Sequence, residues 1–160
     1  MRMFALAAAA ALVLSYSSAM ADGFATTASI NVGAGSAIAG GGSIGLEEGF
    51  GPWSIGGELQ AEGFSAPELR SLEAVAARGG YRFPLAGKTI TVAAFGGVGE
   101  AQGAGDHAAF VAGADLDLLP QGGNVGGGLR YEHVAAFDVA RFGGRPADAD
   151  LILARLTYRP

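Results

Sequence analysis

The sequence predicts an all-β fold, an eight-stranded antiparallel up-and-down transmembrane β-barrel. Three observations lead to it: a start typical of exported proteins, strands with one apolar and one polar face, and connections that alternate between tight and loose. Successive side chains of an extended strand point to opposite sides, so each strand has two faces. The stretch from Asn124 to Val134 separates them clearly, with Asn124, Gly126, Gly128, Arg130 and Glu132 opposed to Val125, Gly127, Leu129, Tyr131 and His133. A small barrel in lipid needs such strands, with the apolar face outward.

Residues 1–21 have the pattern of a cleaved signal peptide. Met1-Arg2 is a short positive start, an apolar run follows from Met3 to Leu14, and Ala19-Met20-Ala21 is an A-x-A cleavage site. The apolar run is too short for a membrane-spanning helix. We therefore expect export, a mature chain of residues 22–160 that forms one barrel domain, and a final location in the outer membrane of a Gram-negative cell.

Composition excludes several other classes of protein. The mature chain carries nine basic and fifteen acidic residues once Arg2 is removed, a formal net charge of −6, which argues against nucleic acid as a partner. The chain has no cysteine, so an exported protein of this size must be stable without disulfides. A closed barrel meets that need because it pairs every backbone group and leaves no strand edge. The 28 glycines also argue against long helices.

Turn signals divide the mature chain into eight extended stretches. We place them at about 25–35, 39–48, 53–63, 71–84, 88–100, 107–119, 123–136 and 148–159. Tight connections rich in Gly and Pro follow the second, fourth and sixth stretches, at residues 48–52, 85–88 and 120–123. The other connections are looser, and 137–147 is the longest. This parity fits a barrel with short periplasmic turns, longer outside loops and both termini in the periplasm.

The first four stretches alternate between apolar and polar side chains. Their apolar faces hold Ala28, Ile30 and Val32; Ile44 and Leu46; Trp53, Ile55, Leu59 and Ala61; and Val75, Ala77, Tyr81 and Phe83. Their polar faces hold Thr27, Ser29 and Asn31; Ser43 and Glu47; Ser54, Glu58, Gln60 and Glu62; and Arg78 and Arg82.

The last four stretches follow the same rule, least clearly in the fifth. There Ile90, Val92 and Val98 oppose Thr91, Ala93 and Phe95, with no charge in the middle of the strand. In the sixth, Phe110, Ala112, Leu116 and Leu118 oppose Asp115 and Asp117. The seventh is the Asn124–Val134 strand, and in the eighth Ile152, Ala154, Leu156 and Tyr158 oppose Arg155 and Arg159.

Charges of both signs collect on the polar faces. They are Glu47, Glu58, Glu62, Asp115, Asp117 and Glu132 with Arg78, Arg82, Arg130, Arg155 and Arg159. Eight strands enclose an interior only wide enough to be filled by side chains. A set of mixed sign can form ion pairs there, whereas charges of one sign would be costly to bury. We therefore predict a lumen plugged by an ion-pair network.

The apolar faces are sorted by depth. Their charged residues Glu73, Glu100 and Asp150, together with His133, fall at the ends that the topology places outside the cell. Aromatic residues lie near the periplasmic ends: Phe24, Trp53, Tyr81, Phe83 and Tyr158. This arrangement predicts an interfacial aromatic girdle, with Trp53, Tyr81, Phe83 and Tyr158 as its main members.

With these features the mature chain resembles the small outer-membrane β-barrel families, the OmpA-like transmembrane domain and the opacity-type porin-like proteins. The segments "GGYRF" at 79–83 and "GGGLRYEHV" at 126–134, and the closing "LILARLTYRP", carry the resemblance. It implies outer-membrane lipid, lipopolysaccharide and the barrel-assembly machinery as partners, and a structural or surface-interaction role. The families commonly end in an aromatic residue, whereas here Arg159 and Pro160 follow Tyr158.

One segment suggests chemistry. The run from Arg130 to Ala136 looks similar to the last-but-one strand of lipid A deacylases, whose motif is His-x-Ser-Asn on the outer wall. His133 matches that histidine, but Ala135 stands where the serine nucleophile would be, and a serine hydrolase needs its hydroxyl. We therefore expect no enzyme and no cofactor. We also expect no metal site, because His107 and His133 lie on different strands without ligand spacing.

Three alternatives stay open. The barrel could be a porin-like channel for small solutes, a degenerate lipid A deacylase-like barrel, or a soluble secreted barrel that binds an apolar ligand with its faces inverted. The third alternative requires Glu58, Arg78 and Asp115 to be exposed to water. The loop 137–147, with Arg141, Phe142 and Arg145, is where a surface partner is expected, since loops commonly carry function.

Overall fold

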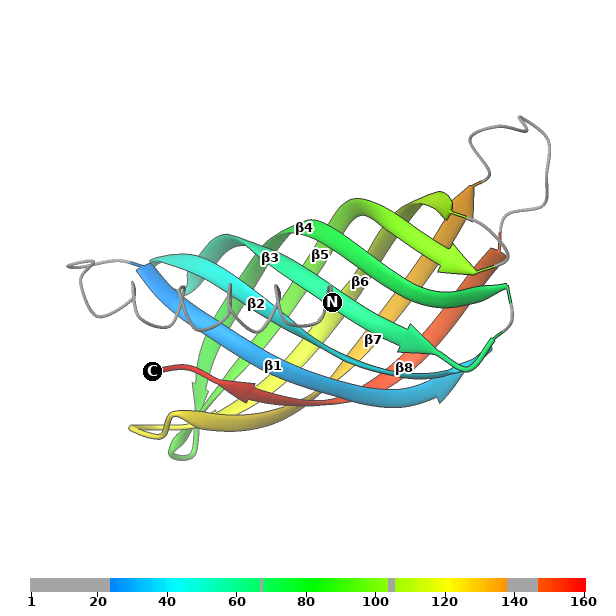
Figure 1. The fold of residues 1–160 in the computed structure, drawn as a ribbon. Helices are drawn as coiled ribbons and strands as arrows, with labels where there is room; N and C mark the ends of the chain where they lie inside the picture. Colours follow the sequence, from blue (N-terminus) through cyan, green and yellow to red (C-terminus); the bar gives the residue numbers. More distant parts are fainter. Residues whose placement is uncertain (1–23, 67, 104–105, 138–146) are drawn as a thin grey trace.

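The chain forms one closed antiparallel barrel in a computed structural model that describes residues 24–66, 68–103, 106–137 and 147–160. The eight strands are β1 (Phe24–Gly35), β2 (Ile38–Phe50), β3 (Trp53–Phe64), β4 (Leu69–Leu85), β5 (Lys88–Gly103), β6 (Asp106–Pro120), β7 (Val125–Phe137) and β8 (Ala147–Tyr158). Each strand pairs with its neighbours in sequence, and β8 closes the sheet on β1 (Figure 1). The all-β, eight-stranded up-and-down barrel predicted from sequence is confirmed.

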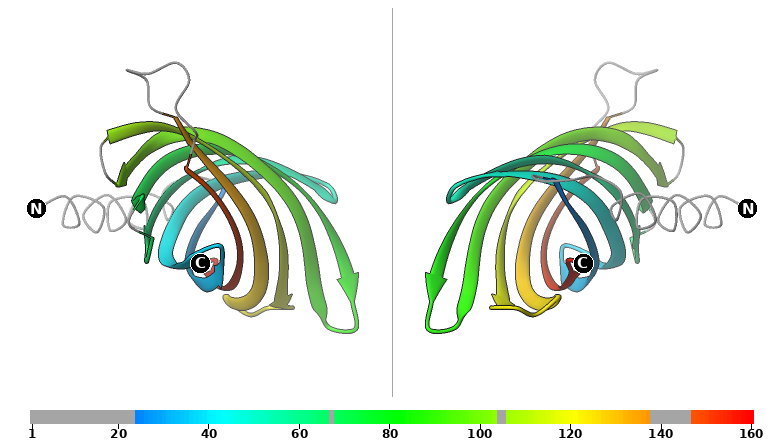
Figure 2. Two further views of the ribbon diagram at one scale, coloured as in Figure 1. Left: turned by 90° about the vertical axis from the view of Figure 1, so that its right-hand side faces the viewer. Right: turned by 90° about the vertical axis from the view of Figure 1, so that its left-hand side faces the viewer.

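The strands wrap obliquely around a common axis (Figure 2). Following paired residues from Ala25 through β2 to β8 leads back to β1 at Gly35, a displacement of ten residues (35 − 25). In a closed barrel such a stagger goes with strands tilted by roughly 35–45°. The tilt brings side chains from non-adjacent strands to the same height inside the barrel, which allows them to contact one another.

Tight turns gather at one end of the barrel, with the start of β1 and the end of β8 (Figure 1). We call it the turn end, and the opposite end the loop end. Gly51, Gly87 and Gly122 in the three turns have positive φ, as does Ala86 at 45°. Ala86 and Gly87 form a two-residue hairpin between β4 and β5, and positive φ at both positions matches the twist of the flanking strands.

The observed strands differ from the predicted stretches mainly at the loop end. β4, β5 and β6 run to 17, 16 and 15 residues, so the connections expected at 64–70 and 101–106 are shorter than predicted. β7 begins at Val125, so Asn124, which we placed at the start of that strand, precedes it. The predicted signal peptide and most of the loop 137–147 lie outside the described residues.

Candidate functional site: the filled lumen and the apolar outer face

Every charged residue predicted for the polar faces has its side chain inside the barrel. Glu47, Glu58, Glu62, Asp115, Arg130, Glu132 and Arg155 are buried, and Arg78, Arg82, Asp117 and Arg159 are half-buried. Their positions follow from strand alternation, because their neighbours in sequence point outward. They come from six strands and from the residue after β8, and the closure of the barrel brings them together.

Asp115 is the centre of the ion pairs. Its carboxylate accepts hydrogen bonds from Arg130 at 2.7 and 3.0 Å, and from Arg78 Nε at 3.0 Å. Arg155 Nη1 makes a third contact with the same carboxylate. Asp115 is on β6, and its register partner on the adjacent strand β7 is Arg130. The other two arginines are on strands that do not pair with β6, because Arg78 is on β4 and Arg155 is on β8. Three guanidinium groups therefore hold strands from different sides of the barrel to one carboxylate.

Glu58 connects the same arginines to the opposite wall. It lies 2.6 Å from Arg130 Nη2 and 3.6 Å from Arg155 Nη2. Gln60 donates a hydrogen bond to one oxygen of Glu58, and Ser43 donates to the other at 3.5 Å. With these contacts a buried carboxylate is both paired and hydrogen-bonded, the condition under which burial of charge is tolerated.

The Arg130 guanidinium also lies over the Phe95 ring, 4.2 Å from its centroid. This is cation–π geometry inside a site from which water is largely excluded. Gly113 makes room for the ring, because a Cβ there would lie 2.6 Å from Phe95 and 2.1 Å from the carbonyl oxygen of Tyr131. The small residue on β6 thus permits the position of Arg130.

A second group of charges lies toward the turn end. Glu47 pairs with Arg78 at 3.4 Å, with Arg82 at 3.1 Å and with Arg159. Asp117 pairs with Arg78 at 3.2 Å and with Arg155 at 3.8 Å. A cavity of about 30 Å³ lies among these groups. It has room for a few water molecules at most, far less than an aqueous channel needs.

Glu62 and Glu132 are the least compensated carboxyl groups. Glu132 Oε2 lies 3.6 Å from Arg130 Nη1, and within the described residues it accepts no hydrogen bond. Glu62 accepts a hydrogen bond from Asn31 at 3.4 Å and contacts Glu132. With six acids against five bases on the inner face, this pair of carboxyl groups has the weakest ion pairing among the described residues.

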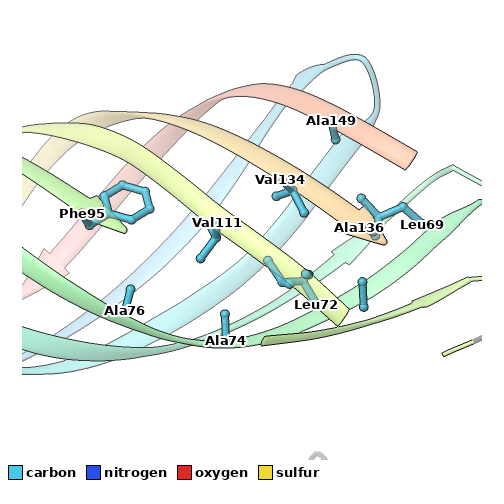
Figure 3. Close-up of a cluster of buried hydrophobic side chains, with 11 residues drawn as sticks. Leu69, Leu72, Ala74, Ala76, Phe95, Val111, Val134, Ala136 and Ala149 are labelled. Carbon is cyan, nitrogen blue, oxygen red and sulfur yellow. The ribbon is translucent and has the colours of Figure 1, made fainter. Parts of the chain in front are cut away.

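Apolar side chains fill the lumen on the loop side of the ion pairs, which sequence reasoning missed. The cluster includes Leu69, Leu72, Ala74, Val111, Val134 and Ala136 (Figure 3). Leu151 and Leu153 belong to a second buried group. A signal was present in the sequence. Leu72 and Ala74 share strand parity with Arg78, Val134 with Arg130, and Leu151 and Leu153 with Arg155. These strands are therefore polar inside only toward the turn end.

The outer face is covered by exposed apolar side chains. Ile30 and Ile152, in the middle of their strands, are 65% and 64% exposed, and Ile55 near the start of β3 is 59% exposed. The predicted aromatic residues are also on this face. Trp53 packs edge-on against Tyr81 at 4.7 Å between ring centroids, and Tyr81 lies 5.8 Å from Phe83. All three, with Tyr158, lie near the turn end.

His133 belongs to a small polar cluster on the outer face. Its Nδ1 lies 3.0 Å from Asp150 Oδ1, and the Tyr131 hydroxyl donates to the same oxygen at 2.7 Å. Ala135 follows on the same face, so the cluster has an acid and a histidine but no serine on β7.

Among the described residues no group of three or more potential metal ligands occurs. No helix in the described parts of the chain is long and apolar enough to cross a membrane.

These features define a class: closed eight-stranded up-and-down barrels with charges enclosed and apolar side chains outside, the architecture of small outer-membrane proteins. The chain is similar to one solved member in particular, Neisserial surface protein A, whose crystal structure matches with a TM-score of 0.55. The match covers 85% of this chain and 92% of that chain at 12% sequence identity. Comparisons with known protein families and with curated proteins returned no match. The similarity confirms, at the level of fold, the resemblance to small outer-membrane barrels.

Proposed function

We propose that the chain is an integral outer-membrane barrel with a structural or surface-interaction role, a closed lumen and no catalytic activity. The observation that carries the proposal is the inversion of polarity. Arg130, Glu132 and Asp115 are 2% exposed or less, whereas Ile30, Ile38 and Ile152 are more than 60% exposed. In water such a surface would be a large aggregation-prone patch, whereas in a bilayer it meets lipid tails.

The same contrast counts against the soluble secreted barrel. That alternative needs Glu58, Arg78 and Asp115 on the surface, but they are in the interior ion pairs. The porin-like alternative is disfavoured by the apolar cluster and by the small cavity among the charges. The deacylase alternative is disfavoured by Ala135, which stands where the serine nucleophile would be.

In the proposal, the outer face contacts membrane lipid and lipopolysaccharide, and the assembly machinery inserts the barrel. The name of the Neisserial structure supports a surface location.

Fractionation of expressing cells tests the proposal. We expect the protein in the outer-membrane fraction, resistant to extraction by carbonate or high salt. We also expect faster migration on a gel when the sample is not heated, because a closed barrel resists detergent and stays compact. Release by carbonate, or identical migration with and without heating, would contradict the proposal. A peripheral outer-membrane lipoprotein processed in the same cells serves as the control for extraction.

A further inference from the structure

The small cavity among the second group of charges opens toward the turn end. Its volume is about 30 Å³. Side-chain exposure rises from 0% at Asp115 to 13% at Asp117 and 21% at Arg159, so water reaches the cavity from the turn end. On the loop side, the ion pairs of Asp115 and the apolar cluster fill the lumen. The cavity is therefore a pocket at the turn end of the interior. We call it the turn-end cavity.

Positive charge exceeds negative charge around the turn-end cavity. Its charged lining residues are three arginines and two acids, Arg78, Arg155, Arg159, Glu47 and Asp117. Adding Arg82, which pairs with Glu47, gives a fourth base. Adding Asp115, which pairs with Arg78, gives a third acid, so the bases still exceed the acids by one (4 − 3). A bound anion of charge −1 would restore the balance.

Arg159 is weakly compensated. Among the described residues it pairs with Glu47 alone, and Arg78 and Arg82 share that carboxylate. Burial lowers the pKa of Arg159 below its ordinary value. Glu47 opposes this effect, whereas the guanidinium groups of Arg82 and Arg78 add to it. An anion beside Arg159 would favour its charged form, because an opposite charge nearby stabilises a buried ion.

Hydroxyl groups line the same cavity. Thr27 is on β1 and Thr91 is on β5, four strands away in the closed ring, so the two hydroxyls come from opposite walls. The missing side chain of Gly45 leaves room for one of them, since a Cβ there would lie 2.8 Å from Thr27 Oγ1. A hydroxyl can donate a hydrogen bond, and donors beside a guanidinium group form a set suited to an anion.

We propose that the turn-end cavity binds one small monovalent anion of the size of chloride, held by Arg159 and the hydroxyls of Thr27 and Thr91. The cavity has room for a few water molecules at most, so it admits chloride and excludes a large organic anion such as gluconate. The anion balances the excess positive charge of the lining. It should therefore bind the folded barrel and stabilise it. The inference requires a folded barrel and does not depend on the proposed location.

Unfolding by urea in micelles of a non-ionic detergent tests the proposal. Trp53 is the only tryptophan, and its fluorescence reports the unfolding. Sodium gluconate is replaced stepwise by sodium chloride at constant ionic strength. We expect the equilibrium constant for unfolding to fall about tenfold when chloride reaches ten times its Kd. At higher chloride each further tenfold increase should lower it another tenfold, the slope for one ion bound per folded barrel.

Variants of the binding groups should change this dependence. Thr27→Val with Thr91→Val, and separately Arg159→Gln, should remove it, whereas Arg159→Lys should retain it because the positive charge remains. Asp117 is the acid that opposes an anion in this cavity. Asp117→Asn should therefore shift the dependence to lower chloride concentrations. Migration without heating shows whether each variant is folded.

Two matched controls should respond to chloride as the parent does. Lys88→Gln removes an exposed positive charge at the same end of the barrel, outside the cavity lining. Thr26→Val makes the same change as Thr27→Val at the preceding residue of β1, whose side chain points to the other face of the strand. These controls separate binding in the cavity from general effects of charge and of threonine replacement.

Three results would overturn the inference. Equal unfolding in chloride and gluconate would mean that the cavity holds water alone. An equal chloride dependence in the parent, the Thr27→Val, Thr91→Val variant and Arg159→Gln would place the effect elsewhere on the protein. A dependence that follows sodium, when choline replaces it, would assign the effect to a cation. A barrel that responds as expected in micelles but is absent from the outer-membrane fraction would support the anion site and contradict the proposed function.

Discussion

Asp115 and Glu132 are both buried acids, yet the surroundings of their carboxylates differ. Asp115 contacts three arginines, one of them through two hydrogen bonds. Glu132 has one arginine at 3.6 Å and a neighbouring carboxyl group. Removal of one partner from a well-formed buried pair leaves an uncompensated charge, whereas removal of an excess charge relieves repulsion. The same type of residue should therefore give opposite results at different positions in the lumen.

Glu58 is a paired acid like Asp115, and it has the same side chain as Glu132. Glu58→Gln and Glu132→Gln therefore test this difference with equal changes in shape. Glu58→Gln should lower the free energy of unfolding by about 3 kcal/mol, because Arg130 and Arg155 each lose a carboxylate partner. Glu132→Gln should leave it within about 1 kcal/mol of the parent or raise it, because its amide can donate to Glu62. Urea titration of Trp53 fluorescence in detergent micelles measures both. Equal losses in the two variants would show that Glu132 is paired as well as Glu58.

At the scale of elements, the position of each strand follows from alternation and turn chemistry, and both are local. Leu129 and Arg130 point to opposite faces because they are neighbours in a strand, which any extended sequence dictates. The contents of the lumen could be predicted only in part. Charged residues were assigned to the inside by parity. Leu72 and Val134 have the same parity as those charges, but they were missed because they are apolar, like the outward residues of the same strands. Depth had to be considered together with parity.

The hairpin between β4 and β5 has one unfavourable residue. Ala86 has a φ of 45°, in a region where a side chain with Cβ is disfavoured and asparagine or glycine is common. Ala86→Asn should stabilise the barrel by up to about 1 kcal/mol, because it relieves the strain and keeps the turn. The midpoint temperature at which the fast-migrating gel band converts to the slow one should rise. Gln121→Asn, in a turn position without positive φ, is the control and should not change the midpoint temperature. If both variants raise it equally, relief of the positive φ at residue 86 is not the cause.

At the scale of the whole molecule, closure and stagger determine which side chains meet. Arg78 and Asp115 are on β4 and β6, which do not pair, and no local pattern predicts their contact at 3.0 Å. The ten-residue stagger tilts the strands and brings the two residues to one height. The ion-pair partners were therefore beyond sequence reasoning, although the set of residues was not. The result is a barrel that is polar in the middle, apolar inside at the loop end and apolar over its whole outer belt.

The central claim is that the outer belt contacts lipid. Because the chain has no cysteine, single cysteines at Leu59, Leu116 and Leu129, all exposed in the middle of the belt, can carry spin labels without background. In reconstituted vesicles we predict that each label collides readily with oxygen, which concentrates in lipid, and is protected from a water-soluble nickel chelate. A label at Gly51, in an exposed turn, should show the reverse. Free access of the nickel chelate to Leu129 in the folded barrel would contradict the account.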